Sequence, residues 1–117
     1  MKIPEDYEIL SLFGVEPVFS SDNAQVPYFY NQSTYTFSNY EKQQFIVSLN
    51  PAYNEVSITV DEDGVRISSL SFRNIQSLEI LKDNENEARI MVSDDRFIIK
   101  LNFKPRFMIF IEEMIDH

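Results

Sequence analysis

The chain has 117 residues, of which 44% are hydrophobic and none is cysteine, so it is sized for one domain with a small core and has no disulfide or thiolate chemistry. Its net charge of −9 disfavours binding to nucleic acids and anionic membranes, since both present negative charge. No apolar run approaches the roughly 20 residues that span a bilayer, and the start does not read as a secretory signal, so we expect one cytoplasmic domain over residues 1–117.

The first predicted element is a short helix over residues 5–13. Tyr7, Leu10 and Phe13 recur at intervals of three, with Ile9 adjacent, which is typical of a helix with an apolar face. Acidic residues at its start suit the positive end of the helix dipole, and Gly14 is a typical residue after a helix end. The following residues 15–24 contain Pro17 and small polar residues, and they predict a loop.

Residues 26–45 hold seven of the 16 aromatic residues of the chain. The spacing of these residues favours two strands joined by a turn near residues 31–33. Three interpretations stay open: a hairpin with one face in the core, a protein-binding face, since tyrosine is a frequent interface anchor, or a platform that stacks sugars or bases. The only nearby cation is Lys42, which argues against nucleic acid.

From Phe45 onward, apolar residues alternate with polar ones, which predicts a series of strands. Asp63 and Gly64 lie between two alternating runs and predict a tight hairpin turn. The alternation changes phase near Ser68 and Ser69, which indicates a β-bulge. Further strands are predicted around residues 75–80, 88–92 and 97–103, separated by polar turns.

Residues 105–116 fit two structures. Phe107, Phe110, Ile111 and Met114 follow the spacing of a helical stripe, and Pro105 fits a first helical turn. The uninterrupted apolar run at residues 107–111 also fits a buried strand. We favour the helix, so the predicted fold is α+β, an antiparallel β-sheet of about six to eight strands with a short N-terminal helix and a C-terminal helix as its covers.

The sequence contains no recognisable catalytic, metal or cofactor site. Its one histidine, His117, is the last residue, which removes most catalytic and zinc arrangements. Gly14 and Gly64 are too far apart to form a phosphate-binding loop. Asp94 and Asp95 are adjacent, so on a strand their carboxylates would point to opposite faces. We therefore expect a protein that is not an enzyme and needs no cofactor.

Two segments resemble a group of bacterial immunity proteins from polymorphic toxin systems. Residues 14–26 (GVEPVFSSDNAQV) resemble the Gly…Pro-x-Phe…Ala-x-Val segment that follows a short helix in that group. Residues 65–80 (VRISSLSFRNIQSLEI) resemble its apolar strand, short polar break and Leu-x-Leu type strand. The resemblance implies a non-catalytic protein that binds and blocks a cognate toxin. The acidic charge is an independent argument, because nuclease toxins tend to be basic and an acidic inhibitor is steered onto them.

The distribution of charge indicates where such a partner would bind. Residues 1–65 contain ten acidic and two basic residues, a net charge of −8, whereas residues 66–117 contain nine and eight, a net charge of −1. Aromatic anchors among acidic residues suit a basic protein partner. We expect one or two of the candidate tyrosines to lie in the core. The predicted partner-binding residues are Tyr28, Tyr30, Tyr35, Tyr40, Asp22, Glu41, Asp61 and Glu62.

Two other functions stay open. A strand-rich body followed by a C-terminal helix is similar to pleckstrin-homology-like domains, which serve as binding scaffolds, although the first half offers no basic loop for phosphoinositides. The other is a small β-rich domain that binds a small ligand. A concave aromatic pocket would favour the small-ligand function, whereas a flat acidic and aromatic face would favour the toxin inhibitor.

Overall fold

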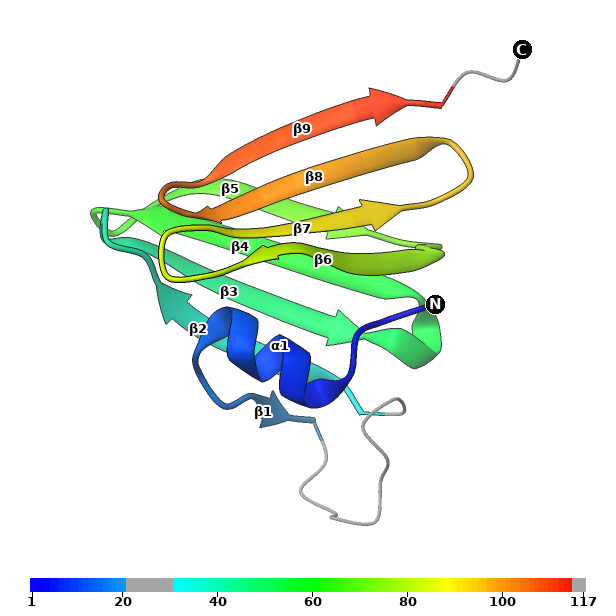
Figure 1. Cartoon of the computed structure of the whole chain (residues 1–117), viewed down its shortest axis with the longest axis horizontal. Coiled ribbons are helices and arrows are strands. Elements are labelled where there is room, and N and C mark those ends of the chain that lie inside the picture. The colour runs from blue at the N-terminus through cyan, green and yellow to red at the C-terminus, as the bar shows by residue number, and fades with distance from the viewer. Residues whose placement is uncertain (21–30, 115–117) are drawn as a thin grey trace.

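The computed structural model describes residues 1–20 and 31–114, which form two antiparallel β-sheets and one α-helix (Figure 1). The predicted antiparallel strands are confirmed, but they form two sheets rather than one. In spatial order, the first sheet contains β1 (Val18–Phe19), β2 (Ser33–Ser38), β3 (Gln43–Asn50), β4 (Glu55–Glu62) and β5 (Val65–Phe72), with the short 3-10 helix η2 (Pro51–Tyr53) between β3 and β4. The second contains β6 (Ser77–Asp83), β7 (Ala88–Ser93), β8 (Phe97–Lys104) and β9 (Met108–Glu113).

The two sheets face each other and share one apolar core. In β3 and β4 every second side chain is buried, because successive residues of a strand point to opposite faces of the sheet. The opposite sheet contributes buried residues of β7 and β8. The ring of Phe45 in β3 lies 5.2 Å from the ring of Phe103 in β8, in an edge-to-face arrangement that joins the two sheets.

The N-terminal helix α1 (Asp6–Phe13) closes one side of this sandwich, next to β6 (Figure 1). Glu5 and Glu8 form a capping box at its start, and Gly14 ends it in the left-handed conformation, with φ of 70°. The helix buries Ile9, Leu12 and Phe13. The predicted N-terminal helix is therefore confirmed, but its buried face differs from the predicted stripe, since Tyr7 and Leu10 are exposed.

The β4–β5 hairpin confirms the prediction made from Asp63 and Gly64. Both residues have positive φ angles, 52° and 78°, as the tight turn between paired strands requires. The predicted bulge is also present, since Asp61 pairs with Arg66 while Val60 pairs with Ser68. Ile67 is therefore the extra residue of β5, immediately before the predicted position.

The predicted C-terminal helix is wrong, because residues 108–113 form the strand β9. β9 pairs with β8 along its whole length, from Phe97↔Glu113 to Asn102↔Met108, and so covers an edge that would otherwise have unpaired backbone groups. In the extended chain Ile109 packs against the core, as does the preceding Phe107. Without a C-terminal helix, the similarity to pleckstrin-homology-like domains loses the feature on which it rested.

Candidate partner-binding site

The structure brings four of the predicted partner-binding residues to one end of the sandwich. Tyr40 and Glu41 lie in the β2–β3 turn, and Asp61 and Glu62 end β4. Tyr40 is 80% exposed. We call this region, together with the β8–β9 turn at residues 105–107, the turn end. The other predicted residues Asp22, Tyr28 and Tyr30 lie outside the described residues.

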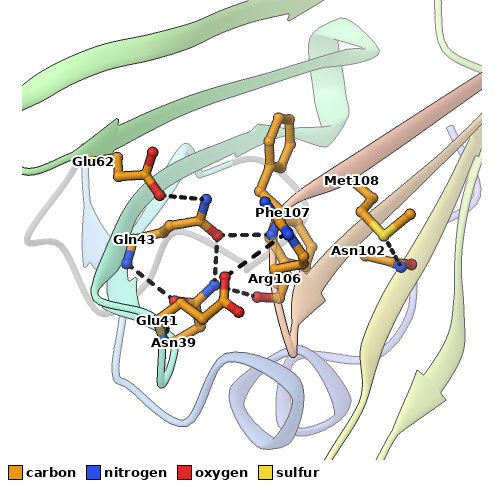
Figure 2. Close-up of polar contacts among 9 residues, drawn as sticks. Asn39, Glu41, Gln43, Glu62, Asn102, Arg106, Phe107 and Met108 are labelled. Atoms are coloured by element: carbon orange, nitrogen blue, oxygen red, sulfur yellow. Dashed lines mark hydrogen bonds and ion pairs between the residues drawn. The ribbon is translucent and has the colours of Figure 1, made fainter.

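A buried polar network fixes the turn end and joins the two sheets (Figure 2). The side-chain amide of Asn39 donates to Gln43 Oε1 at 2.9 Å and to the carbonyl oxygen of Phe103 at 2.9 Å. The backbone N–H of Phe107 donates to the same Gln43 oxygen at 2.8 Å. Gln43 Nε2 donates in turn to Glu62 at 3.3 Å. This network has a clear structural role, since it satisfies buried polar groups of both sheets.

Basic residues neutralise much of the acidic charge at the turn end. Arg66 Nε lies 3.0 Å from the carboxylate of Asp61, and Arg106 Nε lies 3.8 Å from that of Glu41. The hydrogen bond to Asp61 raises the pKa of Arg66 above its ordinary value. Both arginines come from the second half of the sequence. The turn end therefore has an exposed aromatic side chain, Tyr40, but two of its predicted acidic residues are paired within the protein.

Tyr35 is a core residue and cannot act as an exposed anchor. It alternates with outward-facing threonines in β2, and its side chain is 1% exposed. Its ring packs against that of Phe13 at a centroid distance of 5.1 Å. Burial, with a smaller contribution from the negative charge of Asp6, raises the pKa of Tyr35 to about 12.

A second candidate surface lies where α1 meets β1, and sequence reasoning did not identify it. Its exposed apolar and aromatic residues include Tyr7, which is 67% exposed, and Val18, which is 73% exposed. Leu10 and Phe19 are also exposed. The neighbouring acidic residues form no ion pair within the described part of the chain. We define the α1–β1 surface as Glu5, Asp6, Tyr7, Glu8, Leu10, Glu16, Pro17, Val18 and Phe19.

A cavity of about 280 Å³ opens on the α1–β1 surface. Its lining includes the carboxylate-bearing residues Asp6 and Glu16 and the apolar side chains of Leu10 and Phe19. The buried Tyr35 also lines it. The volume lies just below the range of about 300–1,000 Å³ of sites for drug-sized ligands. A single side chain of a partner is a better match to this size.

The α1–β1 surface was missed because two of its residues were assigned to the wrong face of the helix. The interval of three between Tyr7, Leu10 and Phe13 indicated a buried stripe. An α-helix has 3.6 residues per turn, so residues spaced only by three do not stay on one face but shift gradually around the helix axis. The set Ile9, Leu12 and Phe13 includes an i, i+3 and an i, i+4 pair, and this is the face that is buried.

The described residues show neither a metal-binding cluster nor a membrane-spanning helix. Within residues 1–20 and 31–114, no three His, Cys, Asp or Glu side chains are grouped so that they could hold a metal ion. No helix in the same ranges has the length and apolar character needed to cross a bilayer.

Comparison with known proteins finds a similarity of fold. No protein-family model matches the chain, and no curated protein matches its sequence significantly. The structure is similar to a chain of a contact-dependent growth inhibition toxin–immunity protein complex from Klebsiella pneumoniae 342, with a TM-score of 0.68 and 20% sequence identity over 97% of this chain and 96% of that chain. At this identity the similarity concerns the fold. It is consistent with the sequence resemblance to immunity proteins of toxin systems.

Proposed function

We propose that this protein is an immunity-like protein that binds and neutralises a cognate, basic bacterial toxin in the cytoplasm, without catalysing a reaction. The observation that carries the proposal is the likeness of almost the whole chain to a component of a toxin–immunity complex. The net charge of −9 supports a basic partner, because opposite charge accelerates encounter and discourages wrong partners.

We further propose that the α1–β1 surface is the main contact with the toxin. Interfaces typically combine a few apolar or aromatic anchors with a polar rim. Here Tyr7, Leu10 and Phe19 supply the anchors, and Asp6 and Glu16 supply negative charge that no base of the described chain neutralises. The turn end, which holds Tyr40, Glu41, Asp61 and Glu62, is the competing candidate, and its paired acids make it the weaker one.

Growth rescue tests the proposed function. The gene is expressed together with a candidate toxin domain taken from an adjacent reading frame, and growth is compared with that of cells expressing the candidate toxin domain alone. We expect normal growth and co-purification of the two proteins. Continued killing at equal expression of a folded protein would refute the proposal.

Association kinetics test the contact surface. Glu16→Lys reverses one charge on the α1–β1 surface, Glu41→Lys reverses one at the turn end, and Glu85→Lys reverses an exposed charge in the β6–β7 turn as the matched control. We expect Glu16→Lys to slow association most, and the difference to shrink with salt, because the Debye length falls from about 10 Å at 0.1 M to about 3 Å at 1 M. If Glu41→Lys has the largest effect, the toxin binds at the turn end instead.

A further inference from the structure

The cavity on the α1–β1 surface contains a polar group that has no hydrogen-bond partner among the described residues. The side chain of Tyr35 is 1% exposed and lines the cavity, yet its hydroxyl forms no hydrogen bond within the described residues. Among the described residues, the fully buried side-chain atom without a partner is Ser33 Oγ, so the Tyr35 hydroxyl is accessible from the cavity. A ligand inside the cavity can therefore donate a hydrogen bond to this hydroxyl.

The charged groups around the hydroxyl define the kind of ligand. Asp6 and Glu16 line the same cavity, and neither forms an ion pair within residues 1–20 and 31–114. One oxygen of Asp6 accepts the backbone N–H of Tyr7 at 2.8 Å, which leaves its other oxygen available. The cavity therefore presents acceptors and negative charge, and it favours a cation that carries several N–H donors.

The apolar walls indicate that the cation is attached to an aliphatic chain. Tyr7, Leu10, Pro17 and Phe19 surround the acceptors and expose mainly carbon. A planar guanidinium stacks on aromatic rings and has five donors, whereas a lysine ammonium is a compact and strongly hydrated charge. Arginine combines this head group with an apolar stem that can lie along the walls.

We propose that the cavity between α1 and β1 binds an arginine side chain of the partner protein, whose guanidinium donates a hydrogen bond to Tyr35 and pairs with Asp6 and Glu16. The identity of the partner as a toxin rests on the proposed function above. The recognition of arginine does not, because it can be measured on the isolated protein.

A titration of the isolated protein with an arginine analogue tests this proposal. The probe is Nα-acetyl-arginine methylamide, and the control is the citrulline analogue, which has nearly the same shape but no charge. Amide signals of Tyr7, Leu10 and Phe19 are followed by NMR. We expect saturable shifts with a dissociation constant of about 1 mM, as suits a small ligand with few contacts, and at least about tenfold weaker binding of the control, because hydrogen bonds to charged groups are the stronger ones.

Two substitutions then separate the roles of the hydroxyl and of the charge. Tyr35→Phe keeps the ring and should weaken binding of the arginine analogue about tenfold, while Tyr53→Phe removes an exposed hydroxyl elsewhere and should leave it unchanged. If Tyr35→Phe does not fold, Glu16→Gln at the exposed rim should still weaken binding about two- to fivefold.

Absence of saturable shifts, equal binding of the citrulline analogue, or unchanged binding by folded Tyr35→Phe and Glu16→Gln would each overturn the proposal. These failures differ from a failure of the proposed function. If the protein rescues growth but does not bind the arginine analogue, the proposed function stands and the proposed arginine site is rejected. If the protein binds the analogue but does not rescue growth, the arginine site stands and the toxin is rejected as the partner.

Discussion

Replacing Gln43 with leucine tests the network that joins the two sheets. Gln43 is 3% exposed, and its Oε1 accepts hydrogen bonds from the side-chain amide of Asn39 and from the backbone N–H of Phe107. Leucine fills a similar volume but accepts no hydrogen bond, so the donors of Asn39 and Phe107 both lose this acceptor. Each stranded buried donor costs about 1–3 kcal/mol. Since Phe107 is half-buried and leucine adds some apolar burial, we expect a net loss of about 2–4 kcal/mol.

Urea unfolding of the purified protein measures this loss from the midpoint and slope of the transition. The matched control is Gln44→Leu, because Gln44 is the next residue of β3 and faces solvent. Its free energy of unfolding should change by no more than about 0.5 kcal/mol. A loss below about 0.5 kcal/mol in Gln43→Leu, at an unchanged slope, would refute the view that the network stabilises the contact between the sheets.

Three further predictions follow from the core, from Tyr35 and from the hairpin. Phe103→Ala should cost about 3–5 kcal/mol in urea unfolding, and exposed Phe110→Ala much less; similar losses would mean that β8 does not face the core. The pKa of Tyr35 is about 12 in the folded protein and 10.0 ordinarily, so with rising pH this residue ionises first in the unfolded chain. The free energy of unfolding should therefore fall as pH rises from 10 towards 12, and it should fall less in Tyr35→Phe. An equal fall in both proteins would contradict this cause. Gly64→Ala, at φ of 78°, should cost about 1–2 kcal/mol by the same unfolding assay, and a neutral result would mean that the turn relaxes.

The local parts of the fold were predictable because their causes are local. Asp63 and Gly64 specify a turn through their own backbone preferences, and alternation specifies which residues of a strand face inward. The number of sheets was not predictable in this way, because alternation does not identify the partner of a strand. The C-terminal strand was missed for the same reason. The apolar run at residues 107–111 suits a helix or a strand, and backbone pairing with the edge strand β8 favours the strand.

The candidate site was predictable only in part, because charge is compensated across the fold. The sequence correctly identified Tyr40 as an aromatic residue available at the surface, but counting charges by halves of the chain hid the pairing of Glu41 with Arg106, which is 65 residues away. The position of the Tyr35 side chain near Asp6 likewise depends on the packing of α1 against β2. No local pattern reports such contacts.

Each sheet is built from one continuous stretch of chain, residues 18–72 and then residues 77–113, and this order matters during synthesis. When residue 76 has been added, the 37 residues 77–113 of the second sheet are still missing, and at about 5–20 residues per second their synthesis takes roughly 2–7 s. Throughout that time the apolar face of β3 and β4 has no opposite sheet. Phe13 of α1 also lacks Phe103, whose ring packs 5.4 Å away in the finished protein. A growing chain that has not yet reached β8 therefore has an incomplete core beneath both α1 and β3.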